Sequence, residues 1–146
     1  MIRIEHLTKR YATGDRPAVD DLSLDIPAGT FFTLLGPSGC GKSSTLRCIA
    51  GLERPDAGEI AIRDVTVFSS HRRINIPPHR RAVGMVFQSY AVWPHMTVHG
   101  NVAYPLKNLG KNRAEIDEAV RWALRLVGLE RLGHRPAPFL SGGEQQ

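Results

Sequence analysis

The chain has 146 residues, of which 42% are hydrophobic and 23% charged, and it carries a formal net charge of +5. This length and composition are typical of one soluble globular domain with a real core. Its apolar runs are far shorter than the roughly 20 residues that span a bilayer, and residues 1–6 lack the apolar stretch of a signal peptide. We therefore expect a cytosolic chain that reaches a membrane only through a partner.

The positive charge is concentrated in two arginine pairs, at residues 72–73 and 80–81. Such a balance suits nucleic acid or anionic lipid, although a solvated surface is its commoner meaning. The two cysteines, Cys40 and Cys48, stand eight positions apart. That spacing forms neither a Cys-x-x-Cys redox pair nor a set of zinc ligands.

The first half of the chain is predicted to begin with two strands. Apolar and polar residues alternate over residues 2–5 and 22–26, which predicts half-buried strands. The continuous apolar run 31–35 predicts a strand buried on both faces. Apolar residues then fall at helical spacing over 46–50, and Gly51 supplies a helix end. The predicted order is strand, glycine-rich loop, helix.

The middle of the chain alternates between turns and short strands. Residues 55–58 have the composition of a turn, and short strands are expected over 60–67. Two prolines and several basic side chains predict an exposed loop over 69–81. Residues 83–87 form another apolar strand pattern, and 88–99 have no periodicity and are expected to form a loop.

An amphipathic helix is predicted from Arg113 to Val127, where apolar residues recur every three or four positions. Asn112 is expected to cap it, Glu115 occupies the third position of a capping box, and Gly128 ends it. Residues 141–144, Ser-Gly-Gly-Glu, have the Ser-x-x-Glu form of a second capping box. A further helix is therefore expected to begin there.

Residues 36–43, Gly-Pro-Ser-Gly-Cys-Gly-Lys-Ser, match the phosphate-loop pattern G-x-x-x-x-G-K-[ST] in full. Its glycines allow backbone N–H groups to point at phosphate oxygens, and the following helix adds its positive N-terminal end. We expect Lys42 to reach the β- and γ-phosphates and the Ser43 hydroxyl to ligate Mg²⁺. The predicted cofactor-binding residues of this loop are Gly36, Pro37, Ser38, Gly39, Cys40, Gly41, Lys42, Ser43 and Ser44.

The alternative to a phosphate loop is a chance glycine turn, which the strand–loop–helix order argues against. The pattern by itself predicts only that a nucleoside triphosphate binds. Cys40, within the loop, is either a tolerated small residue or a thiol whose alkylation blocks nucleotide binding, and Cys48 is expected to be buried and inert.

Three further features accompany the phosphate loop: Tyr11, Gln88, and residues 140–145, which read Leu-Ser-Gly-Gly-Glu-Gln. With them the chain resembles the ATPase subunits of ABC transporters over essentially its whole length. The resemblance implies an α/β fold of the P-loop NTPase (ABC ATPase) type, truncated, with N-terminal β-strands, a RecA-like core and part of a helical subdomain. It implies one incomplete nucleotide-binding domain over 1–146, with strands and core at 1–87 and the Q-loop and helical subdomain at 88–146.

The resemblance also assigns roles. Tyr11 matches the aromatic residue that stacks on adenine, the alternative being a structural tyrosine. Gln88 matches the Q-loop glutamine, which contacts Mg²⁺ or the attacking water, and is a predicted catalytic residue together with Lys42. The residues predicted to bind ATP held by the phosphate loop of a second copy are Ser141, Gly142, Gly143 and Glu144. The implied active unit is a head-to-tail dimer that binds ATP and Mg²⁺.

Residues 88–105 resemble the pattern of importer ATPases that serve ferric iron, polyamines, thiamine, sulfate and sugars. Trp93 and the Arg-rich segment 77–81 resemble the iron and polyamine group in particular. The resemblance implies that Trp93, Pro94 and Met96 dock a helix of a membrane-spanning permease subunit. A solute-binding protein would take part indirectly. It implies a peripheral location at the cytoplasmic face of the cell membrane.

Residues 140–145 resemble the family's signature motif. In the family, the Walker B aspartate, the catalytic glutamate, the D-loop and the switch histidine all follow this signature. No segment of 1–146 matches them, so we expect this chain to bind nucleotide without efficient hydrolysis. Asp117-Glu118 superficially resembles a Walker B pair, but it lies on the predicted amphipathic helix. His95 and His99 have a metal-compatible spacing that Pro94 argues against.

The rival function is an ABC-type ATPase that acts on nucleic acid. Such proteins often insert coiled coils or zinc modules between the Q-loop and the signature. Here Gln88 and Leu140 stand only 52 positions apart, without heptads or Cys-x-x-Cys. The sequence therefore favours a transporter with no nucleic-acid partner.

Overall fold

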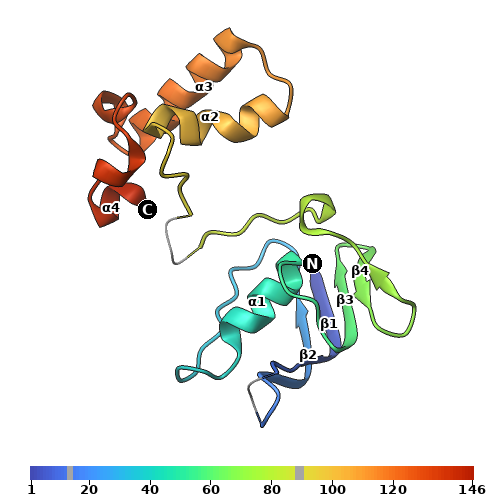
Figure 1. Ribbon diagram of the computed structural model, residues 1–146. Coiled ribbons are helices and arrows are strands. Elements are labelled where there is room, and N and C mark those ends of the chain that lie inside the picture. Colours follow the sequence, from blue (N-terminus) through green and yellow to red (C-terminus); the bar gives the residue numbers. More distant parts are fainter. Residues whose placement is uncertain (13–14, 88–90) are drawn as a thin grey trace. The chain divides into compact units, whose positions relative to one another are not determined.

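A computed structural model describes residues 1–12, 15–87 and 91–146. The chain forms two compact units, Met1–Met85 and Val86–Gln146 (Figure 1). Gln88, the predicted Q-loop residue, lies outside the described residues. Within the described ranges, every helix is too short or too polar to cross a bilayer.

The first unit is built on a five-stranded antiparallel sheet with the strand order β2-β1-β3-β4-β5. Its strands are β1 (Ile2–Lys9), β2 (Val19–Ile26), β3 (Ala57–Ile62), β4 (Val65–Ser69) and β5 (Ile74–Asn75). Helix α1 (Lys42–Ala50) packs against this sheet (Figure 1). The strands predicted over 2–5, 22–26 and 60–67 and the helix ending at Gly51 are confirmed.

An irregularity in β1 decides which of its residues enter the core. Ile4 pairs with Leu24 of β2 on one side and with Ile60 of β3 on the other. The register then shifts before Leu7, and His6 between them has a positive φ of 51°. Because the bulge changes the alternation, Ile4 and Leu7 are both buried although they are three residues apart.

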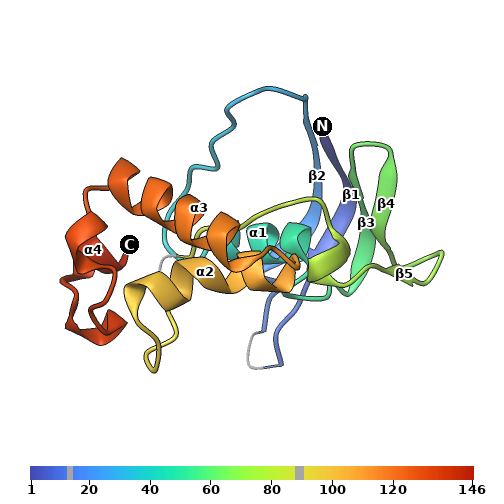
Figure 2. The ribbon, with the colours of Figure 1, turned by 90° about the horizontal axis from the view of Figure 1, so that it is seen from above.

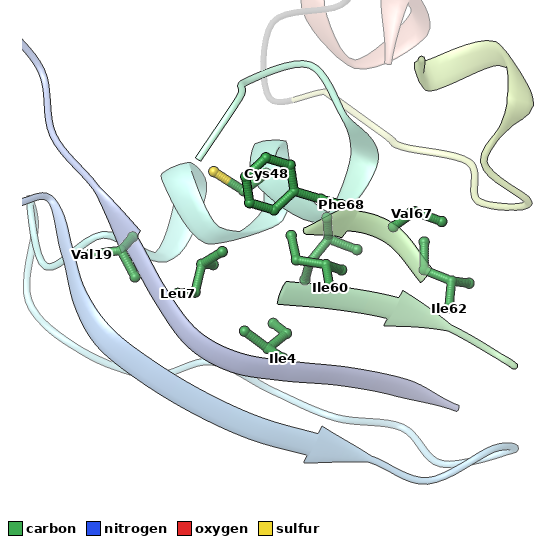
Figure 3. Packing of buried hydrophobic residues seen from close by; sticks show 9 residues of the cluster. Ile4, Leu7, Val19, Cys48, Ile60, Ile62, Val67 and Phe68 are labelled. Atoms are coloured by element: carbon green, nitrogen blue, oxygen red, sulfur yellow. The ribbon is translucent and has the colours of Figure 1, made fainter. Parts of the chain in front are cut away.

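The core of the first unit joins α1 to the sheet. In Figure 3, Cys48 of α1 lies at the ring of Phe68 from β4, and Ile60 of β3 lies beneath them. The buried members of this cluster are Ile4, Leu7, Val19, Cys48, Ile49, Ile60, Ile62, Val67 and Phe68. The packing fixes α1, and with it the loop that leads into α1, onto the sheet.

Two predicted strands are wrong. Residues 31–35 and 83–87 form no strand, and Phe31, Leu35 and Val86 are 98%, 88% and 87% exposed. A strand buried on both faces needs a partner ladder along its edges and layers above and below. Neither run pairs with a strand of the described residues, so apolar composition alone does not make either of them a strand.

The predicted exposed loop over 69–81 is also partly wrong. Ile74–Asn75 forms β5 and pairs with β4, and a 3₁₀ turn covers Pro78–Arg80. Arg81 is buried, with 4% of its surface exposed. The pattern of prolines and charges indicated a loop, but it gave no sign that one of the arginines turns inward.

The second unit is helical. It contains α2 (Val98–Asn108), α3 (Arg113–Leu126), α4 (Gly142–Gln145) and 3₁₀ turns at Glu130–Leu132 and Ala137–Phe139 (Figure 2). Its buried cluster consists of Val98, Ala103, Ile116, Val120, Leu124 and Leu140. The long predicted helix is confirmed as α3, with Asn112 and Glu115 forming the expected capping box, and the helix expected at Ser141 is confirmed as α4.

The predicted loop over 88–99 ends earlier than expected, because α2 begins at Val98. Thr97 is its N-cap, and the Thr97 side chain accepts a hydrogen bond of 3.0 Å from the backbone N–H of Gly100. The capping threonine thus starts the helix in a segment whose sequence lacks visible periodicity.

We expect Phe68→Ala to lower the free energy of unfolding by about 3–5 kcal/mol, because it leaves a cavity between α1 and the sheet. Phe31→Ala is the matched control, and at an exposed site it is expected to change stability by less than about 0.5 kcal/mol. Urea unfolding of both variants measures this. Equal destabilisation by the two changes would contradict the exposed position of the 31–35 run.

Candidate functional site

The predicted phosphate loop joins α1 through Gly41, which is the N-cap of the helix and has a φ of 89°. A Cβ at this position would lie 2.1 Å from the carbonyl oxygen of Ala18, the residue just before β2. A side chain therefore cannot be accommodated without moving the backbone. Glycine here lets the loop lie directly against the beginning of β2.

The Lys42 ammonium lies within the loop that precedes it. Its Nζ donates hydrogen bonds of 2.8 Å to the Gly36 carbonyl and 2.7 Å to the Pro37 carbonyl, and it lies 3.3 Å from Cys40 Sγ. The carbonyl contacts hold the side chain at the centre of the loop. Charged oxygens bind an ammonium more strongly than neutral carbonyls do, so a phosphate group can replace these contacts.

The two serines after Lys42 differ in their surroundings. Ser43 is exposed in the first turn of α1, and its hydroxyl has no hydrogen bond to the described residues. Ser44 is buried, and its Oγ lies 3.0 Å from the hydroxyl of Tyr11. Ser43 is thus the serine whose hydroxyl remains available, as a metal ligand requires.

Tyr11 bridges the first turn of α1 and the turn that follows the helix. Its hydroxyl contacts Ser44 and donates a hydrogen bond to Glu53. The pKa of the Tyr11 phenol is raised, mainly by its partial burial and next by its hydrogen bond with Glu53. The phenol therefore remains protonated and able to donate over a wider pH range.

The opposite end of α1 is held by Arg81, a residue that the sequence did not single out. Its Nη1 donates to the carbonyls of Cys48 and Ile49 at 2.7 and 2.9 Å, and its Nε donates to Ile76 at 2.7 Å. A cation at the C-terminal carbonyls complements the helix dipole. Gly51 makes room for it, because a Cβ there would lie 2.5 Å from Arg81 Nε. Burial lowers the pKa of Arg81.

The predicted signature residues lie in the second unit, at the start of α4. The backbone N–H and the hydroxyl of Ser141 both donate to Glu144 Oε2, at 2.7 and 2.8 Å. These two hydrogen bonds lower the pKa of Glu144, and the one from the backbone has the larger effect. The Ser141 hydroxyl is therefore engaged by its own capping partner, while Gly142 and Gly143 place no side chain beside it.

The predicted docking residues form a short segment before α2. Trp93 and Pro94 are exposed, Met96 is half-buried, and the Trp93 ring lies 4.3 Å from the Tyr104 ring between centroids. Asn101 holds the backbone of Trp93 at both ends: its Oδ1 accepts from Trp93 N at 2.7 Å and its Nδ2 donates to Trp93 O at 3.2 Å.

Backbone hydrogen bonds connect this segment to the residues that precede the signature. Val98 N donates to Arg135 O at 2.9 Å, and Ala137 N donates to Met96 O at 3.1 Å. Thr97 and Pro136 form an isolated β-bridge between the same stretches. The docking segment and the lead-in to the signature are therefore joined by backbone as well as by the helical core.

The remaining candidates have ordinary partners. His99 Nε2 lies 3.1 Å from Asp117 Oδ1, which links α2 to α3. His95 is exposed on the preceding segment, and no cluster of three or more metal-ligating side chains occurs in residues 1–12, 15–87 and 91–146. Asp117 and Glu118 lie on α3, as expected from its amphipathic pattern.

The family model and the similar proteins all indicate the same family. A family model described as ABC transporter matches residues 19–146. The trehalose/maltose import ATP-binding protein MalK of Thermococcus litoralis is 50% identical over 91% of this chain. The spermidine/putrescine import ATP-binding protein PotA of Rubrobacter xylanophilus and the Fe(3+) ions import ATP-binding protein FbpC of Brucella abortus are each 48% identical over 99% of it. The chain spans 36–39% of the length of these relatives.

The fold is shared with a solved ATP-binding cassette. The dimeric structure of MJ0796 bound to ADP and Pi superposes with a TM-score of 0.85 at 29% identity, covering 99% of this chain and 65% of that one. A second dimeric structure of MJ0796, described as a bacterial ABC transporter cassette, gives a TM-score of 0.84 at 30% identity, with the same coverage. These matches confirm the predicted cassette fold, which is partial here.

The two cysteines are expected to differ in reactivity. Cys40 is exposed in the loop, whereas Cys48 is buried and burial raises the pKa of its thiol to about 11. Near neutral pH almost none of the Cys48 thiolate forms. Iodoacetamide should therefore alkylate Cys40 in the folded chain and spare Cys48, and both should react in urea. Peptide mass spectrometry measures each site; similar rates in the folded chain would contradict the buried position of Cys48.

Proposed function

This chain belongs to the ABC transporter family, and we propose that it binds ATP with Mg²⁺ and couples the nucleotide to solute import. The observation that carries the proposal is the phosphate loop at the start of α1, with the Lys42 ammonium held at its centre. The proposed subunit is peripheral, at the cytoplasmic face of the membrane.

In this proposal the triphosphate replaces the carbonyl partners of Lys42. The incoming oxygens accept from Lys42 Nζ and from the N–H groups of the loop and of the first turn of α1. Tyr11, whose hydroxyl contacts Ser44 in the first turn of α1, provides a flat ring for the adenine. The relatives' names, which specify ATP binding, support the choice of adenine over other bases.

Mg²⁺ fits one residue of the described site. The exposed Ser43 hydroxyl follows Lys42 directly, and we propose its oxygen as a ligand of the ion. When bound, Mg²⁺ neutralises charge on the β- and γ-phosphates. Gln88 is proposed as a second ligand and as a residue that orients the attacking water, on the family resemblance alone.

We also propose that the two units are the P-loop core and helical subdomain of one nucleotide-binding domain that works as a dimer. Dimeric cassettes among the solved relatives support this. In the dimer, Ser141 to Glu144 face ATP held by the second copy. The Ser141 hydroxyl must then leave Glu144, its partner in the isolated chain.

The proposed partner is a pair of membrane-spanning permease subunits, fed by a solute-binding protein. Exposed Trp93 and Pro94, on a segment fixed by Asn101, are the proposed contact. The backbone bonds from Met96 and Val98 to residues 135–137 give a route by which docking can shift the signature. The sugar, polyamine and iron relatives leave the solute itself open.

Lys42→Ala is expected to abolish ATP binding, because it removes the ammonium that faces the terminal phosphates. Lys111→Ala is the matched control, since Lys111 pairs with Glu115 in the second unit and touches no predicted site residue. Calorimetric titration with ATP–Mg²⁺ measures both. An unchanged affinity of the Lys42→Ala variant for ATP–Mg²⁺ would contradict the assignment of the phosphate loop.

The wild-type chain and its Lys42→Ala variant also test the hydrolysis of ATP. We propose that these 146 residues bind ATP without efficient hydrolysis, because a carboxylate general base contributes about 10²–10⁴-fold and the family places it after the signature. Phosphate release is compared with that of a longer chain carrying those motifs. Equal rates, both stopped by Lys42→Ala, would contradict this location of the base.

Trp93→Ala is expected to weaken binding to the membrane subunits at least about tenfold, as truncation of an aromatic anchor does at interfaces. Trp122→Ala is the control, because Trp122 is also exposed but lies on α3, outside the proposed contact. Binding to permease reconstituted in nanodiscs measures both variants. A larger loss with Trp122→Ala would move the docking surface to α3.

A further inference from the structure

A chain of hydrogen bonds connects the helix that carries the phosphate loop to the ring of Tyr11. The phenol hydroxyl has a single proton, which it donates to Glu53, so the 3.0 Å contact with Ser44 is one that Tyr11 accepts from the Ser44 hydroxyl. Arg47 donates to the other carboxylate oxygen of Glu53 at 3.1 Å. The carboxylate is thus fixed from both sides, with 19% of its side chain exposed.

The face of the Tyr11 ring is also constrained. The Lys9 ammonium lies over the ring, 5.2 Å from its centroid, and is itself held by a 2.9 Å hydrogen bond to the Arg54 carbonyl. A cation over an aromatic face is attractive. With its hydroxyl bound at one end and a cation over one face, the ring has lost most of its freedom before any ligand arrives.

The place of Ser44 on α1 relates this chain of hydrogen bonds to the proposed nucleotide site. Ser44 follows Lys42 and Ser43, the residues proposed to contact the phosphates and the ion. The anchored hydroxyl therefore sets the distance between the phosphate end and the ring that receives the base. We propose that Glu53 is a positioning residue, which acts through the Tyr11 hydroxyl to fix that ring for the base; this rests on the proposed function.

Prior ordering of a side chain reduces the entropy that is lost when the ligand binds. Losing the anchor should therefore weaken ATP binding by about threefold to tenfold. Inorganic tripolyphosphate has no base, so its binding depends on the loop alone. A purely structural role for Glu53, as a tie between α1 and the end of β1, would affect both ligands alike.

The experiment titrates ATP and inorganic tripolyphosphate, each with Mg²⁺, into the 146-residue chain and its variants by calorimetry. Glu53→Ala and Tyr11→Phe are each expected to weaken ATP by about threefold to tenfold and to leave tripolyphosphate unchanged. Because both changes remove the same bond, the double variant should be no weaker than either single one. Tyr11→Phe keeps the ring, so it tests the hydroxyl without removing the aromatic face.

Glu59→Ala is the matched control: Glu59 pairs with Arg72 in the same unit and does not contact Tyr11. It is expected to leave both ligands unchanged. The inference is overturned if Glu53→Ala weakens both ligands equally, if it weakens neither, or if its effect adds to that of Tyr11→Phe. A wild-type chain that binds neither ligand would refute the proposed function itself, whereas one that binds both with equal affinity would refute the base contact and this inference with it.

Discussion

The contact between Gly41 and the carbonyl of Ala18 is the constraint on which the candidate site depends. It seats the phosphate loop against the start of β2, at a place where no other residue type fits. From there α1 runs across the sheet, and Cys48 and Ile49 bury its other end in the core. The position of the loop is therefore a consequence of how the helix packs.

A positively charged side chain lies at each end of α1, and the two side chains have different roles. Arg81 satisfies the carbonyls at the C-terminal end and is itself buried, so it supports the helix structurally. Lys42 at the N-terminal end is bound by carbonyls of a more exposed loop, where an anion can replace them. Lys42, whose carbonyl partners an anion can replace, is the cation that we propose for the nucleotide.

Motifs with local geometry were predictable from the sequence, because their residues determine backbone shape without help from distant segments. The capping boxes at Asn112 and Ser141 and the helix end at Gly51 are of this kind. The structure of runs 31–35 and 83–87 was not predictable from the sequence, because a buried strand depends on partners that its own residues cannot specify.

The contacts that refine the candidate site depend on tertiary structure in the same way. Arg81 is one of several arginines in its region, and nothing in the sequence distinguishes the one that reaches the carbonyls of α1. The phosphate-loop pattern identified Lys42, but Glu53, which lies 42 positions from Tyr11, follows no motif. Its contact with the phenol arises where the end of β1 meets the turn after α1.

The most direct test of this account is to locate the bound nucleotide by the backbone amide shifts of the ¹⁵N-labelled chain on addition of ATP–Mg²⁺. We predict that the largest shifts fall on residues 36–44 and on Tyr11, with α3 unaffected. Shifts concentrated instead on the basic residues 71–73 and 79–80 would mean that the anion binds to surface charge, and would contradict the account.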